Sequence, residues 1–167
     1  MDKAQYWIDL LNLTPHPEGG YFKEIYSSKL YVDGNLLSSE FNGRRNLSTS
    51  IYFLLKSDEA SRFHMLRSDE IWYYHTGSSL TICTIDEYGK QIETVLGKDF
   101  EKNDVFQAVI PAGTIFGAFV NEPDNFTIVG CMVSPGFTFE DFELLDRQWL
   151  LKKYPQHSGI ILKMTNP

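Results

Sequence analysis

The sequence predicts an all-β fold, a sandwich or barrel of short strands, with a helix before it and a short helix after it. Between residues 48 and 133 the chain contains eight runs that are rich in β-branched and aromatic residues. Turn signals such as Ser68-Asp69 and Pro111-Ala112-Gly113 separate these runs at short, regular intervals. Such spacing is typical of antiparallel sandwiches and barrels.

The amino-acid composition and net charge limit the classes of protein to which this chain can belong. Hydrophobic residues make up 43% of the chain and charged residues 22%, so we expect residues 1–167 to form one globular domain. The net charge of −7 and the scattered Lys and Arg residues argue against a nucleic-acid polymer as partner. No apolar run reaches the roughly 18 residues of a membrane span, and no signal core is visible near the start. We therefore expect a cytoplasmic protein without a membrane partner.

The N-terminal part should form a helix, a loop and a strand in that order. Apolar side chains recur every three to four residues in 3–12, which predicts an amphipathic helix that the following proline ends. The stretch HPEGG at 16–20 is a loop in which glycines can take positive φ, and 21–28 has the composition of a strand. The sequence Asp-Gly-Asn at 33–35 predicts a tight hairpin turn, and 43–46 an exposed loop.

The rest of the chain is strand-rich up to a helical tail. The eight β-like runs are 48–55, 62–66, 70–76, 79–86, 91–96, 105–110, 114–120 and 126–133. Residues 143–153 predict a short helix that buries Leu144, Leu145 and Trp149, and we expect the last residues to be partly frayed. In FEDFE at 139–143 we expect a packing or dimer element with buried phenylalanines and solvated acidic residues.

Residues that could take part in catalysis or binding are concentrated in the stretch SRFHMLRSDEIWYYHTG at 61–77. It contains two of the four histidines, a glutamate and several aromatic residues. It should form two strands joined by a tight turn. Because side chains alternate along a strand, Glu70, Trp72 and Tyr74 should share one face. His64 lies across the turn. We predict that His64 and Glu70 point into the fold, within hydrogen-bond reach of each other or of a shared water.

This stretch resembles the first motif of the cupin superfamily, whose members are small jelly-roll barrels. The motif places a His-x-His pair before a glutamate and a closing glycine. His64, Glu70 and Gly77 match the first histidine, the glutamate and the glycine at the right intervals. The position of the second histidine holds Leu66, which is a departure from the motif.

The second cupin motif and several longer stretches extend the resemblance. Pro111 and Gly113 match its Pro-x-Gly, whereas its histidine position holds Phe116. A family of single-domain cupins with a poorly defined role is similar along almost the whole chain, through HPEGGYF, STSIYFLL, FHMLRSDEIWYYHTG, IPAG and VGCMVSPGFTFEDFEL. The resemblance implies a double-stranded β-helix, the cupin jelly roll, associated as a homodimer. It also implies a shape similar to that of the metal-independent sugar-nucleotide epimerases.

A metal site is the first alternative for the His–Glu stretch. Cupin metal sites combine about three histidines with one carboxylate, because iron, manganese and nickel need several nitrogen and oxygen ligands. Leu66 and Phe116 cannot bind a metal, which leaves His64 and Glu70 as the ligands of a weak site. We expect no cofactor, with a divalent metal on these two residues as the alternative.

Two other histidines could supply a further ligand to such a metal site. His16 could approach the site from the N-terminal loop. His75 lies five residues after Glu70, so strict alternation puts it on the opposite face of the strand unless a bulge intervenes.

Catalysis is the second alternative. His64 is the candidate base because histidine titrates near neutral pH, and Glu70 could orient its imidazole or act itself if burial raises its pKa. By analogy with the epimerases, Tyr74, Tyr52 or Tyr21 would return the proton. The substrate would be a small ring-bearing metabolite such as a sugar nucleotide.

Binding or sensing without chemistry is the third alternative. Aromatic side chains at the mouth of a barrel would hold a small ring by stacking, and Glu18 in the HPEGG loop would close one end over it. The candidate ligand-binding residues are Glu18, Tyr21, Tyr52, His64, Glu70, Trp72 and Phe116. The two cysteines, Cys83 and Cys131, lie in apolar runs and should be buried thiols.

Overall fold

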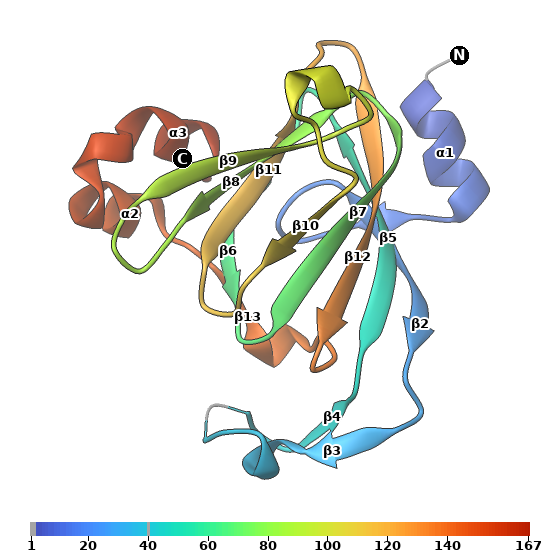
Figure 1. The fold of residues 1–167 in the computed structure, drawn as a ribbon, viewed down its shortest axis with the longest axis vertical. Coiled ribbons are helices and arrows are strands. Elements are labelled where there is room, and N and C mark those ends of the chain that lie inside the picture. Colours follow the sequence, from blue (N-terminus) through green and yellow to red (C-terminus); the bar gives the residue numbers. More distant parts are fainter. Residues whose placement is uncertain (1–2, 40) are drawn as a thin grey trace.

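Two antiparallel sheets form the body of the protein in the computed structural model, which describes residues 3–39 and 41–167 (Figure 1). The six-stranded sheet has the order β1 (Thr14–Pro15), β2 (Tyr21–Ser27), β5 (Thr49–Lys56), β12 (Phe126–Ser134), β7 (Asp69–Gly77) and β10 (Gln107–Ile110). The five-stranded sheet has the order β13 (Phe142–Leu144), β6 (Ser61–Leu66), β11 (Ile115–Val120), β8 (Leu80–Ile85) and β9 (Gln91–Leu96). From β5 to β8, and again from β9 to β13, each strand lies in the opposite sheet from the strand before it, as in a jelly roll.

A small arm and three helices complete the fold. The arm is a two-stranded ribbon of β3 (Tyr31–Asp33) and β4 (Arg44–Asn46), which extends away from the two sheets (Figure 1). The α-helices are α1 (Lys3–Leu11), α2 (Arg147–Lys153) and α3 (Ser158–Lys163). Short 3-10 turns occupy Gly34–Leu36, Phe100–Lys102, Phe139–Asp141 and Pro155–His157. No helix in the described part of the chain is long and apolar enough to cross a membrane.

Three apolar clusters explain why these elements pack as they do. The main core lies between the sheets and takes inward-facing residues from both, such as Phe53, Trp72 and Phe116. A second cluster, with Phe63 and Cys83, fills the space between the five-stranded sheet and the C-terminal helices. A third holds α1 against β5 and β12. Alternation along β6 sends Phe63 to the second cluster and leaves the neighbouring side chain, His64, facing the interior.

The predicted strands lie where the sequence pattern puts them, within about two residues at each end. The arm differs. Residues 33–35 do not form a tight hairpin turn, because Gly34–Leu36 is a 3-10 turn and the partner of β3 is β4. Residues 43–46 are not an exposed loop, since they contain β4 and the buried Arg45.

The C-terminal prediction also needs correction. The helix begins at Arg147, because residues 142–144 pair with β6 as an additional strand. The last residues are not frayed: α3 follows, and Met164 is fully buried in the second apolar cluster. Long-range packing decides both outcomes, and local sequence patterns carry little information about it.

Candidate functional site

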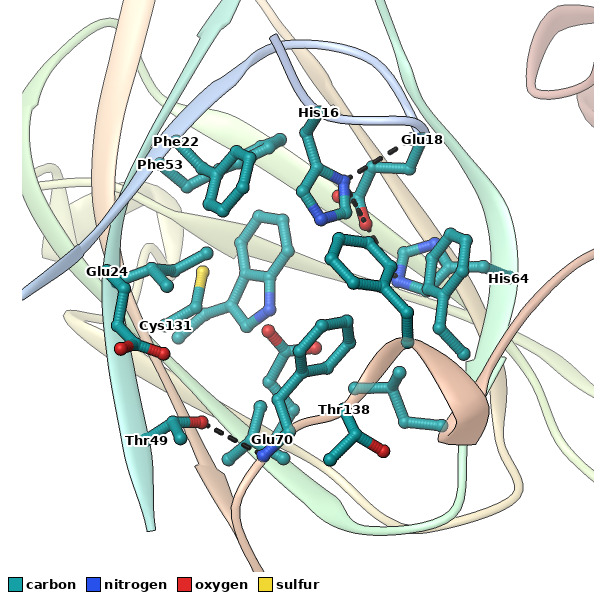
Figure 2. Close-up of a pocket in the computed structure, with 17 residues that line it drawn as sticks. His16, Glu18, Phe22, Glu24, Thr49, Phe53, His64, Glu70, Cys131 and Thr138 are labelled. Carbon is teal, nitrogen blue, oxygen red and sulfur yellow. Dashed lines mark hydrogen bonds and ion pairs between the residues drawn. The ribbon is translucent and has the colours of Figure 1, made fainter. Parts of the chain in front are cut away.

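A cavity of about 240 Å³ opens between the two sheets and is the candidate site (Figure 2). Its walls come from β2, β5, β6, β7 and β12, from the loop at 16–20, and from the segment at 137–142. The lining residues are His16, Glu18, Phe22, Glu24, Thr49, Ile51, Phe53, His64, Leu66, Glu70, Trp72, Cys131, Val133, Phe137, Thr138, Phe139 and Phe142. More than half of them are aromatic or aliphatic. Of the polar ones, Glu18, Thr49, His64 and Glu70 are buried, whereas Glu24 is exposed.

Glu18 joins two histidines at one end of the cavity (Figure 2). Its Oε2 lies 3.3 Å from Nδ1 of His16 and 3.4 Å from Nε2 of His64. Its other oxygen, Oε1, accepts a 2.7 Å hydrogen bond from the Ser61 hydroxyl. The side chains of all three residues of this His16–Glu18–His64 cluster are less than a tenth exposed.

The glycines of the HPEGG loop position Glu18. Gly19 and Gly20 have φ of +115° and +69°, as the sequence predicts for a loop of this kind. A Cβ atom at Gly19 would meet the carbonyl oxygen of Ala60, so the loop lies directly against the start of β6. This close approach brings Glu18 onto Ser61 and His64.

The hydrogen bonds of the cluster fix its protons. Nδ1 of His64 lies 2.6 Å from the carbonyl oxygen of Arg62, and because a carbonyl only accepts, Nδ1 carries a hydrogen. The contact between Nε2 of His64 and Glu18 is then attractive only if one further proton lies between them. His64 and Glu18 therefore share one proton in this arrangement.

His16 differs from His64 in its hydrogen bonds. Its Nδ1 accepts a hydrogen bond from the backbone N–H of Glu18, at 3.3 Å. Burial lowers the pKa of His16, against an opposing effect of the Glu18 carboxylate. His16 is thus neutral near pH 7, and its ring packs edge-on against Phe22 and stacks over Phe139.

Glu70 lies apart from this cluster, on β7 (Figure 2). Its neighbours across the sheet are Val133 on β12 and Ile110 on β10, and the residue is 7% exposed. Burial, and to a lesser degree the negative charge of Glu18, raise the pKa of Glu70 to about 8. Glu70 is consequently a neutral carboxylic acid at pH 7.

Trp72 follows Glu70 on the same face of β7 and contributes the second polar group there. Its indole nitrogen and the thiol of Cys131 are near enough to lower the pKa of Glu70 in part. The geometry at the indole does not reach that of a hydrogen bond, so Trp72 Nε1 is buried without a partner among the described residues. A buried N–H without a partner costs about 1–3 kcal/mol, which a ligand would recover.

The segment 134–142 covers one side of the cavity with Phe137, Thr138, Phe139 and Phe142. Asp141, in its 3-10 turn, accepts hydrogen bonds of 3.0 and 3.1 Å from the guanidinium of Arg45. The expectation for FEDFE was therefore wrong for two residues. Asp141 is buried by this ion pair, whereas Phe139 is 56% exposed although it borders the cavity.

The cavity brings together some of the predicted site residues. Glu18, His64, Glu70 and Trp72 line it. His64 and Glu70 are both buried there, but the ion pair of His64 is with Glu18. His16 reaches the site from the N-terminal loop, which the sequence left open as an alternative.

The tyrosines lie elsewhere. Tyr74 shares the inner face of β7 with Trp72, but its hydroxyl donates to the carbonyl oxygen of Gly77 at 2.6 Å. Tyr21 and Tyr52 pack toward α1 in the third apolar cluster. No tyrosine is among the described residues that line the cavity, so the tyrosine acid of the epimerase analogy has no counterpart here.

Phe116 and His75, which the sequence analysis also considered for the site, do not line the cavity either. Phe116 is buried in the main core, with its ring centre 4.1 Å from that of His64. His75 occupies a register shift between β7 and β12 and is exposed on the outer face against Tyr52.

The donor set does not fit a cupin metal centre. Leu66 and Phe116, which stand at the two other histidine positions, offer no ligand atom. In the described part of the chain, no three His, Cys, Asp or Glu side chains are arranged to hold a metal ion. We derive no step that passes through a metal.

Two sheets that enclose a small, largely apolar cavity define a double-stranded β-helix barrel. The chain belongs to the cupin superfamily, since residues 5–145 match the family described as Cupin superfamily (DUF985).

Similar proteins share nearly the whole fold. A protein of Shewanella oneidensis, SO0799, is 42% identical with a TM-score of 0.90, over 100% of this chain and 99% of that one. A hypothetical protein from Leishmania major is 36% identical with a TM-score of 0.89, over 98% and 99%. The uncharacterized protein YML079W of Saccharomyces cerevisiae is 31% identical over 157 residues, which are 89% of this chain and 78% of that protein.

Proposed function

We propose that the protein binds a small, ring-bearing polar metabolite in the cavity between the sheets. The observation that carries this proposal is a cavity with aromatic walls in which one buried polar group, the indole nitrogen of Trp72, has no partner among the described residues. Its volume of about 240 Å³ is below the range of about 300–1,000 Å³ that is usual for drug-sized ligands. The ligand is therefore of single-ring size, and a sugar nucleotide would place its sugar ring inside and its nucleotide outside.

Filling the cavity tests this proposal. Ile51 lines the cavity from β5, and Ile51→Phe would reduce the free volume. Ile92→Phe is the matched control, because Ile92 is 44% exposed on β9, away from the cavity. Saturation-transfer NMR with a panel of monosaccharides, sugar nucleotides and cyclic carbonyl compounds should show binding to the parent and to Ile92→Phe. Equal binding by Ile51→Phe would contradict a ligand in this cavity.

Proton transfer is a second candidate function, favoured by a histidine and a buried carboxylic acid that line one cavity. When Nε2 of His64 carries no proton, it can take one from a carbon atom next to a carbonyl. Neutral Glu70 can donate a proton from another side of the cavity. The reaction would be an epimerisation or isomerisation of the bound ring.

Deuterium exchange separates catalysis from binding. In D₂O, an isomerase should wash deuterium into a bound sugar nucleotide, detected by mass spectrometry. His64→Gln should reduce this rate at least about a hundredfold, since a positioned acid or base contributes about 10²–10⁴. Binding by the parent without any wash-in would identify a binding or sensing module instead.

A further inference from the structure

We propose that the carboxyl O–H of Glu70 and the indole N–H of Trp72 form a donor pair that holds one carbonyl oxygen of the ligand. This inference rests on the proposed binding function and names the ligand class as cyclic carbonyl compounds. The two side chains lie two residues apart on β7, so they point to the same face, and both line the cavity.

The proposal is based on the burial of Trp72 and Glu70 and on the missing hydrogen-bond partner of the Trp72 indole. Trp72 is 1% exposed, and its Nε1 has no hydrogen-bond partner in the described part of the chain. It lies close to the carboxyl group of Glu70, a residue that is 7% exposed. The two polar groups are therefore neighbours on a cavity wall that is otherwise mostly apolar.

The groups that face Glu70 keep its proton in place. Toward it lie the Glu18 carboxylate from the 16–20 loop, the Cys131 thiol from β12 and the Trp72 indole from β7. Burial raises the pKa of Cys131 well above its usual value, so the thiol is uncharged as well. No described cation offsets the burial of Glu70, and it can donate a hydrogen bond at neutral pH.

A carbonyl oxygen matches this donor pair better than other acceptors. It has two lone pairs and no hydrogen, so it can accept from both donors and leaves no further donor to satisfy. A ligand carboxylate would bring a second negative charge into a buried site that already contains Glu18, which is unfavourable. In a proton-transfer reaction the same donors would stabilise an enolate oxygen as its charge develops.

The test compares two probes of nearly equal shape. Cyclohexanone has the carbonyl oxygen, whereas methylenecyclohexane has a CH₂ group in its place. Binding is followed by the ¹H–¹⁵N resonance of the Trp72 indole, which Trp72→Phe identifies by its loss. We expect cyclohexanone to shift this resonance downfield and to bind at least about tenfold more tightly than methylenecyclohexane.

The pH dependence identifies the second donor. Affinity of the parent for cyclohexanone should fall at least about fivefold between pH 6.5 and pH 9.5, as Glu70 loses its proton at a pKa of about 8. Glu70→Gln keeps a donor that does not titrate, so its affinity should be constant over this range. A parallel loss of affinity in Glu70→Gln would overturn the assignment of Glu70.

The remaining outcomes separate this inference from the proposed function. Equal affinity for the two probes, with binding abolished by Ile51→Phe, would reject the donor pair and leave the cavity as a binding site. Cyclohexanone binding without any shift of the Trp72 indole resonance would reject the role of Trp72. Binding of neither probe would reject the carbonyl class, while the function would still stand on the wider ligand panel.

Discussion

Glu70 shows how a strand can hold a carboxyl group in its neutral form. Strand β7 lies between β12 and β10, so the neighbours of Glu70 on both sides are aliphatic. Desolvation then favours the protonated acid, and the nearby charge of Glu18 acts in the same direction. The residue occupies a cupin motif position that ordinarily suggests a metal ligand, yet here its surroundings suit hydrogen-bond donation.

The stability of the protein should depend on pH through this residue. The pKa of Glu70 rises from an ordinary value of 4.5 to about 8 on folding, so the folded protein binds more protons between these values. The free energy of unfolding therefore falls as pH rises through this window. Relative to Glu70→Gln, the parent should lose on the order of 2–3 kcal/mol between pH 5 and pH 7. Urea unfolding of both proteins at the two pH values measures this difference, and parallel pH profiles would contradict it.

His64 is a residue whose position followed from sequence but whose partner did not. From the sequence we predict that it points into the fold, and its place in the cavity wall confirms this. Its ion pair with Glu18 depends on a loop that is distant in sequence and lies against the start of β6. The signal in the sequence was the HPEGG loop itself, where a histidine and a glutamate precede two glycines with positive φ.

At the scale of elements, the segment 134–142 and the arm depend on each other. Arg45 of β4 and Asp141 of the segment are both 3% exposed in their side chains and form a bidentate ion pair. Backbone contacts support it, because the N–H of Gly136 donates to the carbonyl oxygen of Asn46. The arm thus fixes the segment that covers the cavity.

Breaking this ion pair should destabilise the protein. Arg45→Met would leave Asp141 buried with the Thr138 hydroxyl and the more distant Arg67, at 3.7 Å, and we expect a loss of about 3 kcal/mol in the free energy of unfolding. The double variant Arg45→Met/Asp141→Leu removes the unpaired charge and should recover at least half of the loss. Urea unfolding measures both.

The control for this prediction is the other acidic neighbour of Arg45. Glu140 lies 3.7 Å from the same guanidinium, but its side chain is 75% exposed. Glu140→Gln should change the free energy of unfolding by less than about 1 kcal/mol, because solvent screens an exposed pair. An equal effect of Glu140→Gln and Arg45→Met would contradict the importance of burial.

At the scale of the whole molecule, the arm is the part whose apolar residues are least covered. Leu30 and Leu36 are 69% and 80% exposed, and Tyr31, Leu37 and Leu47 are each more than 40% exposed. The arm stands away from the barrel (Figure 1), so other described parts of the chain do not cover these side chains. Exposed apolar residues concentrated in this way are typical of surfaces that bind another protein chain.

We expect the protein to be a homodimer that uses this arm. Sedimentation equilibrium should give a mass of 38.4 kDa, which is twice the chain mass of 19.2 kDa. Leu36→Glu would place a charge in the interface and should shift the equilibrium toward the monomer. Tyr88→Glu is the control, because Tyr88 is 86% exposed in the turn between β8 and β9. A monomeric parent, or a dimer that Leu36→Glu leaves intact, would contradict the prediction.

The sequence by itself determined the strand at 21–28, the eight strands between residues 48 and 134, the N-terminal helix and the shared face of Glu70 and Trp72. These features depend on the alternation of neighbouring residues and on local turn residues, which a single sequence contains. The tertiary structure alone decided that His64 pairs with Glu18, that Arg45 and Asp141 are buried together, and that the hydroxyl of Tyr74 turns to Gly77. Each of these outcomes depends on desolvation and on hydrogen-bond partners that only the folded chain supplies, in two of the three cases from distant segments.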